Sequence, residues 1–436
     1  MDLKEATLII ILVCISQSGF CSFPPGDLAN IKESLRISVE NATWEHLTYR
    51  LERQLHKLWN KESSHEDVIP EIHYHRLRNT AGVFPESIAH KIRRRGIVII
   101  RELLDKSEIK REQSHLVEYI YANKAFEDDN FEKCDGIYWS KAQTRLRQNE
   151  DLVKVQRSLL GLFHVRNTSS GDLREPKTLV SGLRIRVPKK NSSPRESSVS
   201  KGRLNSSGGD CLERWVNPAY QHVYRHILHD KFEDYDPFEM DERLKLRSRS
   251  LHGRPKFLSL FQGWLALSSV GAGSLSVLPL LREATAYVML RAFLKDVPSE
   301  IFPGCKPGEP FFELSPFYHR LLHFNMIPLP SLSPGDAVWW HDDLIHSETE
   351  DVKETESIMR LLTGPDYELN KKYSRHLRHN FILKQTLFDN KKHIDERNFK
   401  GSSGFEDLNA LGKTLMGWSV NPGLEDPSLN KCSCTP

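Results

Sequence analysis

The chain has 436 residues, of which 39% are hydrophobic and 27% are charged, and its formal net charge is only +3. This composition is that of a globular protein and excludes a wholly disordered or collagen-like chain, while the length allows one large domain with elaborations or two ordinary domains. The basic clusters, such as residues 91–95, are short and lack interleaved aromatic side chains, so we expect no nucleic-acid partner.

The N-terminus carries an apolar run, Thr7–Ile15, followed by small and polar residues up to Ser22. The run has the length of a signal-peptide core and is too short to span a bilayer. It predicts a secretory signal peptide over residues 1–23, which would send the chain into the secretory pathway. The flank before the run is not clearly positive, so a buried N-terminal helix is the alternative. No later stretch is predicted to span a membrane.

The seven cysteines give no clear framework. Cys14 and Cys21 lie in or beside the apolar run, which leaves five for the rest of the chain. Cys134, Cys211 and Cys305 are scattered without the spacing of a metal site. An odd number of remaining cysteines argues against a complete disulfide framework, so the redox compartment stays open.

Residues 24–83 alternate apolar and charged side chains at helical spacing and predict an N-terminal helical extension. The main domain is predicted over residues 84–385. Near its start, Gly96–Ile100 is a β-branched run after a glycine, which is typical of a buried strand. Within the domain, residues 189–209 are dense in Ser, Lys, Arg, Asn and Gly and predict an exposed, mobile loop.

Four further strands are predicted downstream, each bounded by turn-forming residues: Phe257–Leu267, Ser274–Pro279, Asp336–His341 and Ser357–Leu362. Several strands without alternating helices favour an antiparallel barrel or sandwich over a doubly wound sheet. The predicted class is therefore α+β. Residues 386–436 form a predicted C-terminal tail.

His346 is the best candidate for a metal ligand. Non-haem iron oxygenases hold Fe(II) with two histidines and one carboxylate. In their jelly-roll versions, a Pro-Gly-Asp turn, an aromatic strand and then a histidine typically mark the far ligand, and residues 334–346 follow this pattern. The alternative is a surface histidine after a core strand. Strand alternation sends His341 and Asp343 to the side opposite His346, where they could orient a ligand or the substrate.

The other two iron ligands in these enzymes form a pair, His-x-Asp or His-x-Glu, on an early strand of the barrel. This near pair is harder to find in the sequence. The pattern occurs in four places, which begin at His65, His341, His346 and His393. None of these lies on an early predicted strand. The first lies in the helical extension and the last follows the main domain, so we interpret both as chance matches.

Distinctive blocks of sequence are distributed over residues 84–373: Tyr138–Gln143, Leu183–Arg186, Leu212–Arg225, Phe261–Trp264, Leu278–Thr285 and Gly335–His341. In these blocks the chain resembles the family catalogued as domain of unknown function 1479, which is found in fungi and bacteria. The resemblance implies the double-stranded β-helix (jelly-roll) barrel of clavaminate synthase-like oxygenases, with Fe(II) and 2-oxoglutarate as cofactors. It also implies oxidation of a small organic molecule, with succinate and carbon dioxide as co-products, and a cytoplasmic location.

The chain departs from the family at the near pair. In the family a His-x-Asp stands immediately before the Glu-Arg-Trp block, but here those positions are Ser206 and Gly208. Asp210 is the only nearby carboxylate, so it is the one candidate for the carboxylate ligand beside His346. Two explanations are open: loss of iron chemistry with retention of the barrel, or an error of translation from the gene over this stretch.

A 2-oxoglutarate molecule would need a cationic anchor for its distal carboxylate, and bidentate arginine pairing suits that group. Arg184, Arg186 and Arg360 are the candidates, with the structural ion pair as the alternative for each. Two functional hypotheses follow. The first is an iron(II)/2-oxoglutarate-dependent dioxygenase acting on a small molecule; the second is a catalytically inactive barrel, a pseudoenzyme, that binds a ligand or partner without metal. The sequence does not predict the oligomeric state.

Overall fold

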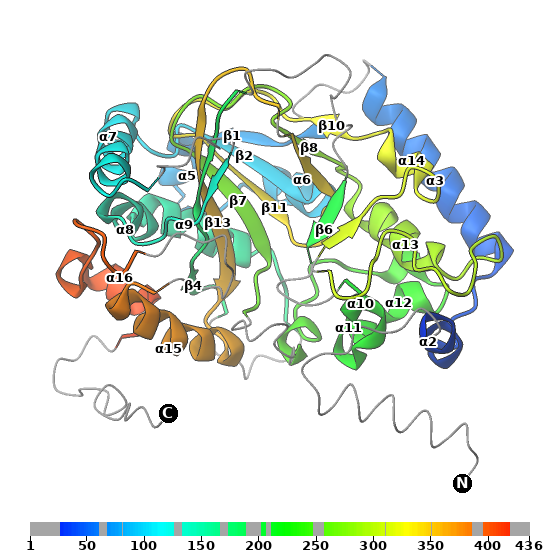
Figure 1. The fold of residues 1–436 in the computed structure, drawn as a ribbon. Helices are drawn as coiled ribbons and strands as arrows, with labels where there is room; N and C mark the ends of the chain where they lie inside the picture. Colours follow the sequence, from blue (N-terminus) through cyan, green and yellow to red (C-terminus); the bar gives the residue numbers. More distant parts are fainter. Residues whose placement is uncertain are drawn as a thin grey trace, which may run out of the picture.

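A computed structural model describes residues 27–60, 68–80, 82–125, 133–165, 173–188, 202–205, 211–246, 257–309, 311–349, 351–385 and 396–418. Two β-sheets lie at the centre of the protein, and helices flank them on both sides (Figure 1). The predicted α+β class is therefore confirmed. The described strands do not close into one hydrogen-bonded barrel, so the jelly-roll prediction is not confirmed at that level of detail.

The larger sheet has eight strands in the order β1-β2-β11-β7-β13-β5-β3, with β4 paired to β13. The bounds are β1 Glu71–His73, β2 Ile97–Arg101, β3 Lys133–Asp135, β4 Pro176–Leu179, β5 Leu183–Arg186, β7 Phe261–Ala266, β11 Ala337–His341 and β13 Glu356–Pro365. Only the β1–β2 pair is parallel among these strands. Ile97–Ile100 of β2 are fully buried, as expected for a continuous β-branched run at the centre of a protein.

The smaller sheet has five antiparallel strands in the order β10-β8-β12-β6-β9. The bounds are β6 Arg203–Asn205, β8 Leu275–Val277, β9 Phe311–Glu313, β10 Ile327–Pro328 and β12 His346–Glu348. Side chains connect the two sheets directly. The Arg186 guanidinium on β5 donates to the backbone carbonyls of Ser274 and Thr349, at 3.1 and 2.8 Å, and these residues flank β8 and β12.

The helices cover the outer faces of the sheets (Figure 1). Their bounds are α2 Asp27–Leu35, α3 Asn41–Trp59, α5 Tyr74–Arg78, α6 Glu86–Arg95, α7 Lys106–Ala122, α8 Lys141–Arg147, α9 Glu150–Leu160, α10 Glu213–Val216, α11 Pro218–Val223, α12 Arg225–Leu228, α13 Leu281–Arg291, α14 Arg320–His323, α15 Glu368–Leu383 and α16 Ala410–Leu415, with 3-10 turns η2 Phe232–Asp234, η3 Arg243–Lys245 and η4 Phe405–Asp407. Helix α3 is amphipathic: its leucines at positions 47, 51, 55 and 58 are buried, and it packs against α13.

The strands predicted from local pattern are present as β2, β7, β8, β11 and β13. Two segments differ from expectation. Residues 24–83 are not wholly helical, because Glu71–His73 joins the larger sheet as β1. Part of the predicted loop 189–209 is strand β6, because Arg203–Asn205 pairs with β12 on one side and β9 on the other; residues 189–201 and 206–209 lie outside the described residues.

The described part of the predicted C-terminal tail belongs to the folded domain. Leu408 and Met416 pack in a second, smaller hydrophobic core with α15. The buried Glu396 carboxylate accepts hydrogen bonds from the Tyr119 hydroxyl at 2.8 Å and from the Tyr138 amide at 2.6 Å. Residues 396–418 therefore close one side of the domain.

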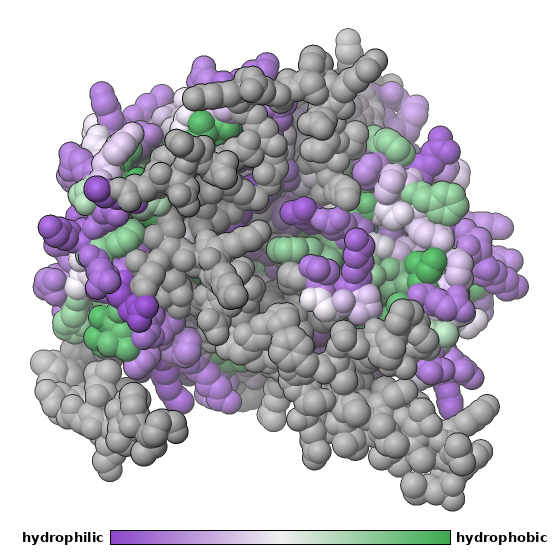
Figure 2. Space-filling view, viewed as in Figure 1, coloured by the Kyte–Doolittle hydropathy of each residue, from purple (hydrophilic) through white to green (hydrophobic). Residues whose placement is uncertain are grey.

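Cys211 and Cys305 form a disulfide with their Cα atoms 5.6 Å apart, a pair that sequence spacing did not identify. The predicted signal peptide, residues 1–23, lies outside the described residues. Within the part of the chain that is described, no helix combines the length and apolar character needed to cross a bilayer. On the face shown in Figure 2, the described surface is mostly hydrophilic, and its hydrophobic residues form small separate groups.

Candidate functional site

The candidate site lies between the two sheets and is named here the intersheet site. It comprises His346 and Glu348 of β12, Arg184 of β5, Arg360 of β13 and Trp340 of β11. Paired residues on neighbouring antiparallel strands point to the same side of a sheet. Arg184 pairs with Ile358 and Arg360 with Trp264, so both arginines share one face of the larger sheet. Ion pairs to Glu348 show that this face looks toward the smaller sheet.

His346 has the surroundings of a neutral imidazole. Its side chain is buried, and its Nδ1–H donates a hydrogen bond to the Leu344 carbonyl at 3.1 Å. Because a carbonyl only accepts, the lone pair of the neutral ring is on Nε2. Burial lowers the pKa of His346 to about 4, so the ring is neutral at ordinary pH. The Trp340 ring lies 5.1 Å away, between ring centroids. A neutral imidazole oriented by a backbone carbonyl is the form in which histidine binds metals.

The three predicted arginine anchors are all on the inner face, but they differ in their partners. Arg186 forms a buried ion pair with Glu356, and that carboxylate also accepts from the Gly271 amide at 2.8 Å and the Ser274 hydroxyl at 2.6 Å. The Arg186 guanidinium further stacks 5.0 Å over the Trp264 ring. Arg186 thus holds the two sheets together.

Arg184 and Arg360 converge on one carboxylate. Arg184 is buried and forms a close ion pair with Glu348. Arg360 approaches the same carboxylate at 3.8 Å, and about a third of its side chain is exposed (32%). Arg360 is therefore more accessible than Arg184, which is buried. After burial, the positive charges of Arg203 and then Arg360 further lower the pKa of His346.

The described residues do not complete an iron centre at His346. Within the described part of the chain, the one group of three metal-ligand side chains lies elsewhere, at His73, His75 and Glu102. Ser206, Gly208 and Asp210, which occupy or adjoin the near-pair positions, are outside the described residues. Arg203 of β6 pairs with His346, so the strand that precedes residue 206 in the chain lies beside the histidine. Among the described residues, His346 therefore belongs to no set of two histidines and one carboxylate that could hold iron.

A buried charge cluster that sequence reasoning missed lies in the turn after β11. Asp343 accepts hydrogen bonds from the guanidinium groups of Arg214 and Arg243, each at 2.5 Å, and from the hydroxyls of Tyr224 at 2.6 Å and Tyr235 at 2.9 Å. All five side chains are buried. Burial alone would raise the pKa of Asp343, but Arg243 and Arg214 outweigh it and hold that pKa well below its usual range. The cluster fixes the segment of residues 213–245 to the end of the larger sheet.

His341 belongs to the same structural network. Its Nε2–H donates to the Pro237 carbonyl at 3.1 Å, and its Nδ1 accepts from the Asp343 amide at 3.0 Å. Its ring stacks with Phe163 at 5.6 Å, and burial lowers its pKa to about 3. His341 ends β11 and His346 begins β12, so a turn between two sheets separates the two histidines, and the predicted alternation along one strand is not present. Both ring nitrogens of His341 are engaged, so the ring holds the fold together.

These features define the class of protein: an α+β protein with two facing sheets, whose interior carries a neutral histidine and an accessible arginine. The sequence profile of the Gig2-like family matches residues 25–418, so this chain belongs to the Gig2-like family. Among its relatives, the uncharacterised protein YbiU of Escherichia coli (strain K12) is 30% identical over 349 residues, which cover 76% of this chain and 81% of YbiU.

Solved structures share the fold over nearly the whole chain. A protein of Salmonella typhimurium LT2, provisionally named an oxidoreductase, has a TM-score of 0.78 and 25% identity, and the match covers 91% of this chain and 98% of that one. GlcNAc Inducible Gene 2 (GIG2, DUF1479) of Candida albicans has a TM-score of 0.75 and 24% identity, with coverage of 92% and 91%. These matches support the family resemblance drawn from the sequence blocks.

Proposed function

We propose that this chain binds a small carboxylate-bearing molecule of the 2-oxo acid class in the intersheet site, without a family-type iron centre. The observation that carries the proposal is the position of Arg360. Its guanidinium is partly exposed, shares the inner face of the larger sheet with Arg184, and approaches the Glu348 carboxylate at 3.8 Å. A guanidinium can form two parallel hydrogen bonds to a carboxylate, and two arginines that converge on one carboxylate position suit a carboxylate-bearing ligand.

The second candidate function is an iron(II)/2-oxoglutarate-dependent dioxygenase acting on a small organic substrate. One specific observation favours it: His346 is neutral and oriented by the Leu344 carbonyl, as a metal-binding histidine would be. In this case Asp210 would supply the carboxylate ligand. The oxidoreductase name of the Salmonella relative agrees with this candidate, whereas Ser206 and Gly208 at the near-pair positions disagree with it.

The two candidates differ in their dependence on metal. Calorimetric titration with 2-oxoglutarate under anaerobic conditions, with and without Fe(II), measures ligand binding, and succinate release in air measures turnover. Binding that needs no metal, without succinate release, supports the binding protein. Binding that requires Fe(II), with succinate release, supports the dioxygenase and overturns the first proposal. Binding under neither condition overturns both.

Arg360→Ala is expected to weaken 2-oxoglutarate binding by about 10- to 100-fold, since a hydrogen-bonded ion pair contributes roughly 1.5–3 kcal/mol. The matched control is Arg375→Ala on the exposed side of α15, which removes the same charge far from the intersheet site and should leave the affinity unchanged. Equal affinities of the Arg360→Ala variant and the wild type would rule out Arg360 as the anchor.

Glu348→Gln is expected to act in the opposite direction. Glu348 is a carboxylate already placed beside Arg184 and Arg360, so it competes with any ligand carboxylate for the same guanidinium groups. Removing its charge should tighten 2-oxoglutarate binding several-fold in the same titration, with thermal melting as a check of the fold. Weaker binding by a folded Glu348→Gln variant would mean that the ligand does not share the partners of Glu348.

A further inference from the structure

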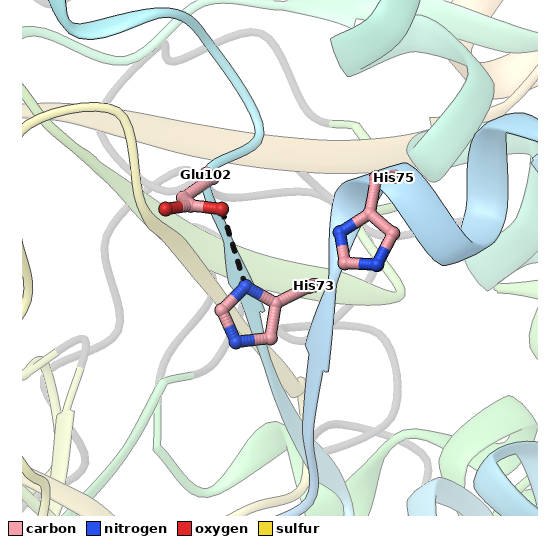
Figure 3. A group of neighbouring side chains, drawn as sticks. All are labelled: His73, His75 and Glu102. Atoms are coloured by element: carbon pink, nitrogen blue, oxygen red, sulfur yellow. Dashed lines mark hydrogen bonds and ion pairs between the residues drawn. The ribbon is translucent and has the colours of Figure 1, made fainter.

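A second group of ligand-type side chains lies at the edge of the larger sheet. His73 ends β1, His75 lies in the first turn of α5, and Glu102 directly follows β2. Each offers one ligand atom, and these atoms lie within 4.8 Å of one another. Figure 3 shows the three side chains gathered together, with the Nδ1 of His73 at 3.3 Å from the Oε2 of Glu102. All three residues are exposed, so a solvated ion can reach them.

The backbone places these side chains through regular pairing. Strands β1 and β2 are parallel and in register, with His73 opposite Arg101. Glu102, the next residue, therefore emerges beside His73. Helix α5 begins immediately after His73, which has the extended backbone of an N-cap residue, and this turn brings His75 back toward the same edge. Three segments thus converge at one point with little freedom to separate.

Glu102 is held in an unusual backbone conformation. Its φ is +54°, in the left-handed region that a non-glycine residue seldom occupies. The buried Asp336 fixes this conformation, because its carboxylate accepts from the Glu102 amide at 2.9 Å. Backbone strain that the surrounding structure maintains is concentrated at functional sites. Here the strain directs a carboxylate toward two imidazoles.

The guanidinium group of the neighbouring Arg101 pairs with carboxylates other than that of Glu102. Arg101 is engaged with Glu71 at 2.6 Å and with Asp336 at 2.8 Å. Among the described residues, the ion-pair partner of Glu102 is His73. Glu102 therefore remains able to serve as an anionic ligand.

We propose that His73, His75 and Glu102 form a surface site for one divalent transition metal ion of the zinc, copper and nickel class. Two imidazole nitrogens and one carboxylate suit these ions, whereas magnesium and calcium prefer all-oxygen sites. With metal–ligand bonds of about 2.0–2.1 Å, the ligands of a tetrahedral zinc ion lie about 3.4 Å apart. The separation of 3.3 Å between His73 and Glu102 already matches this value, and a ligand atom of His75 lies within 4.8 Å of both. The remaining coordination positions are open to water.

A bound ion would link the N-terminal segment to the sheet. His73 and His75 precede the main domain predicted from sequence, whereas Glu102 directly follows β2, the first strand predicted in that domain. Because the ion binds the folded arrangement better than the unfolded chain, its binding adds to the stability of that arrangement.

The test is titration of the full-length protein with Zn(II) alone, followed by calorimetry, with thermal melting measured in parallel. We expect one zinc ion per chain at this site and a higher melting temperature with zinc. His75→Ala and Glu102→Gln should each weaken that binding more than about tenfold, since even residues that merely support metal ligands contribute 10- to 100-fold. Both residues are exposed, and the melting temperature without zinc checks that the variants fold.

Two controls make the result specific. The double variant His376→Ala/His379→Ala removes two exposed histidines from α15, and His346→Gln removes the histidine of the intersheet site. Neither should change the affinity at this site or the zinc-dependent rise in melting temperature. Tetrahedral or five-coordinate absorption bands of Co(II) that disappear in His75→Ala would add support. Absence of zinc binding, or zinc binding that His75→Ala leaves intact, would overturn the proposal.

Discussion

Replacing Asp343 by asparagine is expected to lower the free energy of unfolding by about 3–5 kcal/mol, which is the usual effect of breaking a buried ion pair. Asparagine keeps the shape of the side chain but removes the charge that faces Arg214 and Arg243, and both guanidinium groups are buried. The hydroxyls of Tyr224 and Tyr235 also lose a charged acceptor. Urea unfolding measures the change.

The control for this prediction is Asp351→Asn, which removes the same charge from an exposed position and should change stability by less than about 0.5 kcal/mol. A loss of less than 1 kcal/mol in the Asp343 variant would show that the cluster contributes little to the fold.

The pH dependence of the same variant provides a second check. Because the pKa of Asp343 in the folded protein is well below the value of about 3.9 in an unfolded chain, its stabilising contribution is fully present above that unfolded value. The contribution is lost as the pH falls through the lower, folded pKa. The difference in stability between wild type and Asp343→Asn should therefore be constant from about pH 5 to 8 and shrink only below about pH 4.

Gly335→Ala is the second substitution with a large expected effect, a destabilisation of about 3–4 kcal/mol. Gly335 has a φ of +92°, and an added Cβ would lie 2.2 Å from the carbonyl oxygen of Leu104. The backbone cannot easily move away, because the Gly335 amide donates to Ala266 and its carbonyl accepts from Leu104. The free energy of unfolding, again from urea titration, is the measurement.

Gly308 offers a matched control. Its φ is +87°, nearly the same as at Gly335, but an added Cβ would meet no atom within 4 Å. Gly308→Ala should therefore cost only the left-handed backbone strain, about 1–2 kcal/mol. If the two alanine variants lost equal stability, the close approach to Leu104 would not be the cause of the effect at Gly335.

Local sequence pattern was sufficient to predict several strands of the larger sheet. The β-branched run before Arg101 and the Ser-Pro-Gly turn before Ala337 are short-range signals, and both lead into strands in the structure. The predicted alternation along residues 341–346 did not hold, because β11 ends at His341 and the chain turns before it enters β12 of the other sheet at His346.

Features that depend on contacts between residues far apart in sequence could not be predicted from local sequence pattern. Strand β6 lies in a polar, low-complexity stretch, and it is a strand because β9 and β12 supply hydrogen bonds on both of its edges. The Asp343 cluster joins residues about 100 or more positions apart in sequence. The metal-type group of His73, His75 and Glu102 exists only because β1 lies parallel to β2.

The segment of residues 206–210 is bounded by two fixed points. On one side, β6 is paired with two neighbouring strands, and on the other Cys211 is linked to Cys305. The strand pairs and the disulfide do not depend on which side chains occupy the five positions between them. A chain with Ser206→His and Gly208→Asp would carry the His-x-Asp pattern that the family resemblance implies, in a segment whose two flanks are held by strand pairing and by the disulfide.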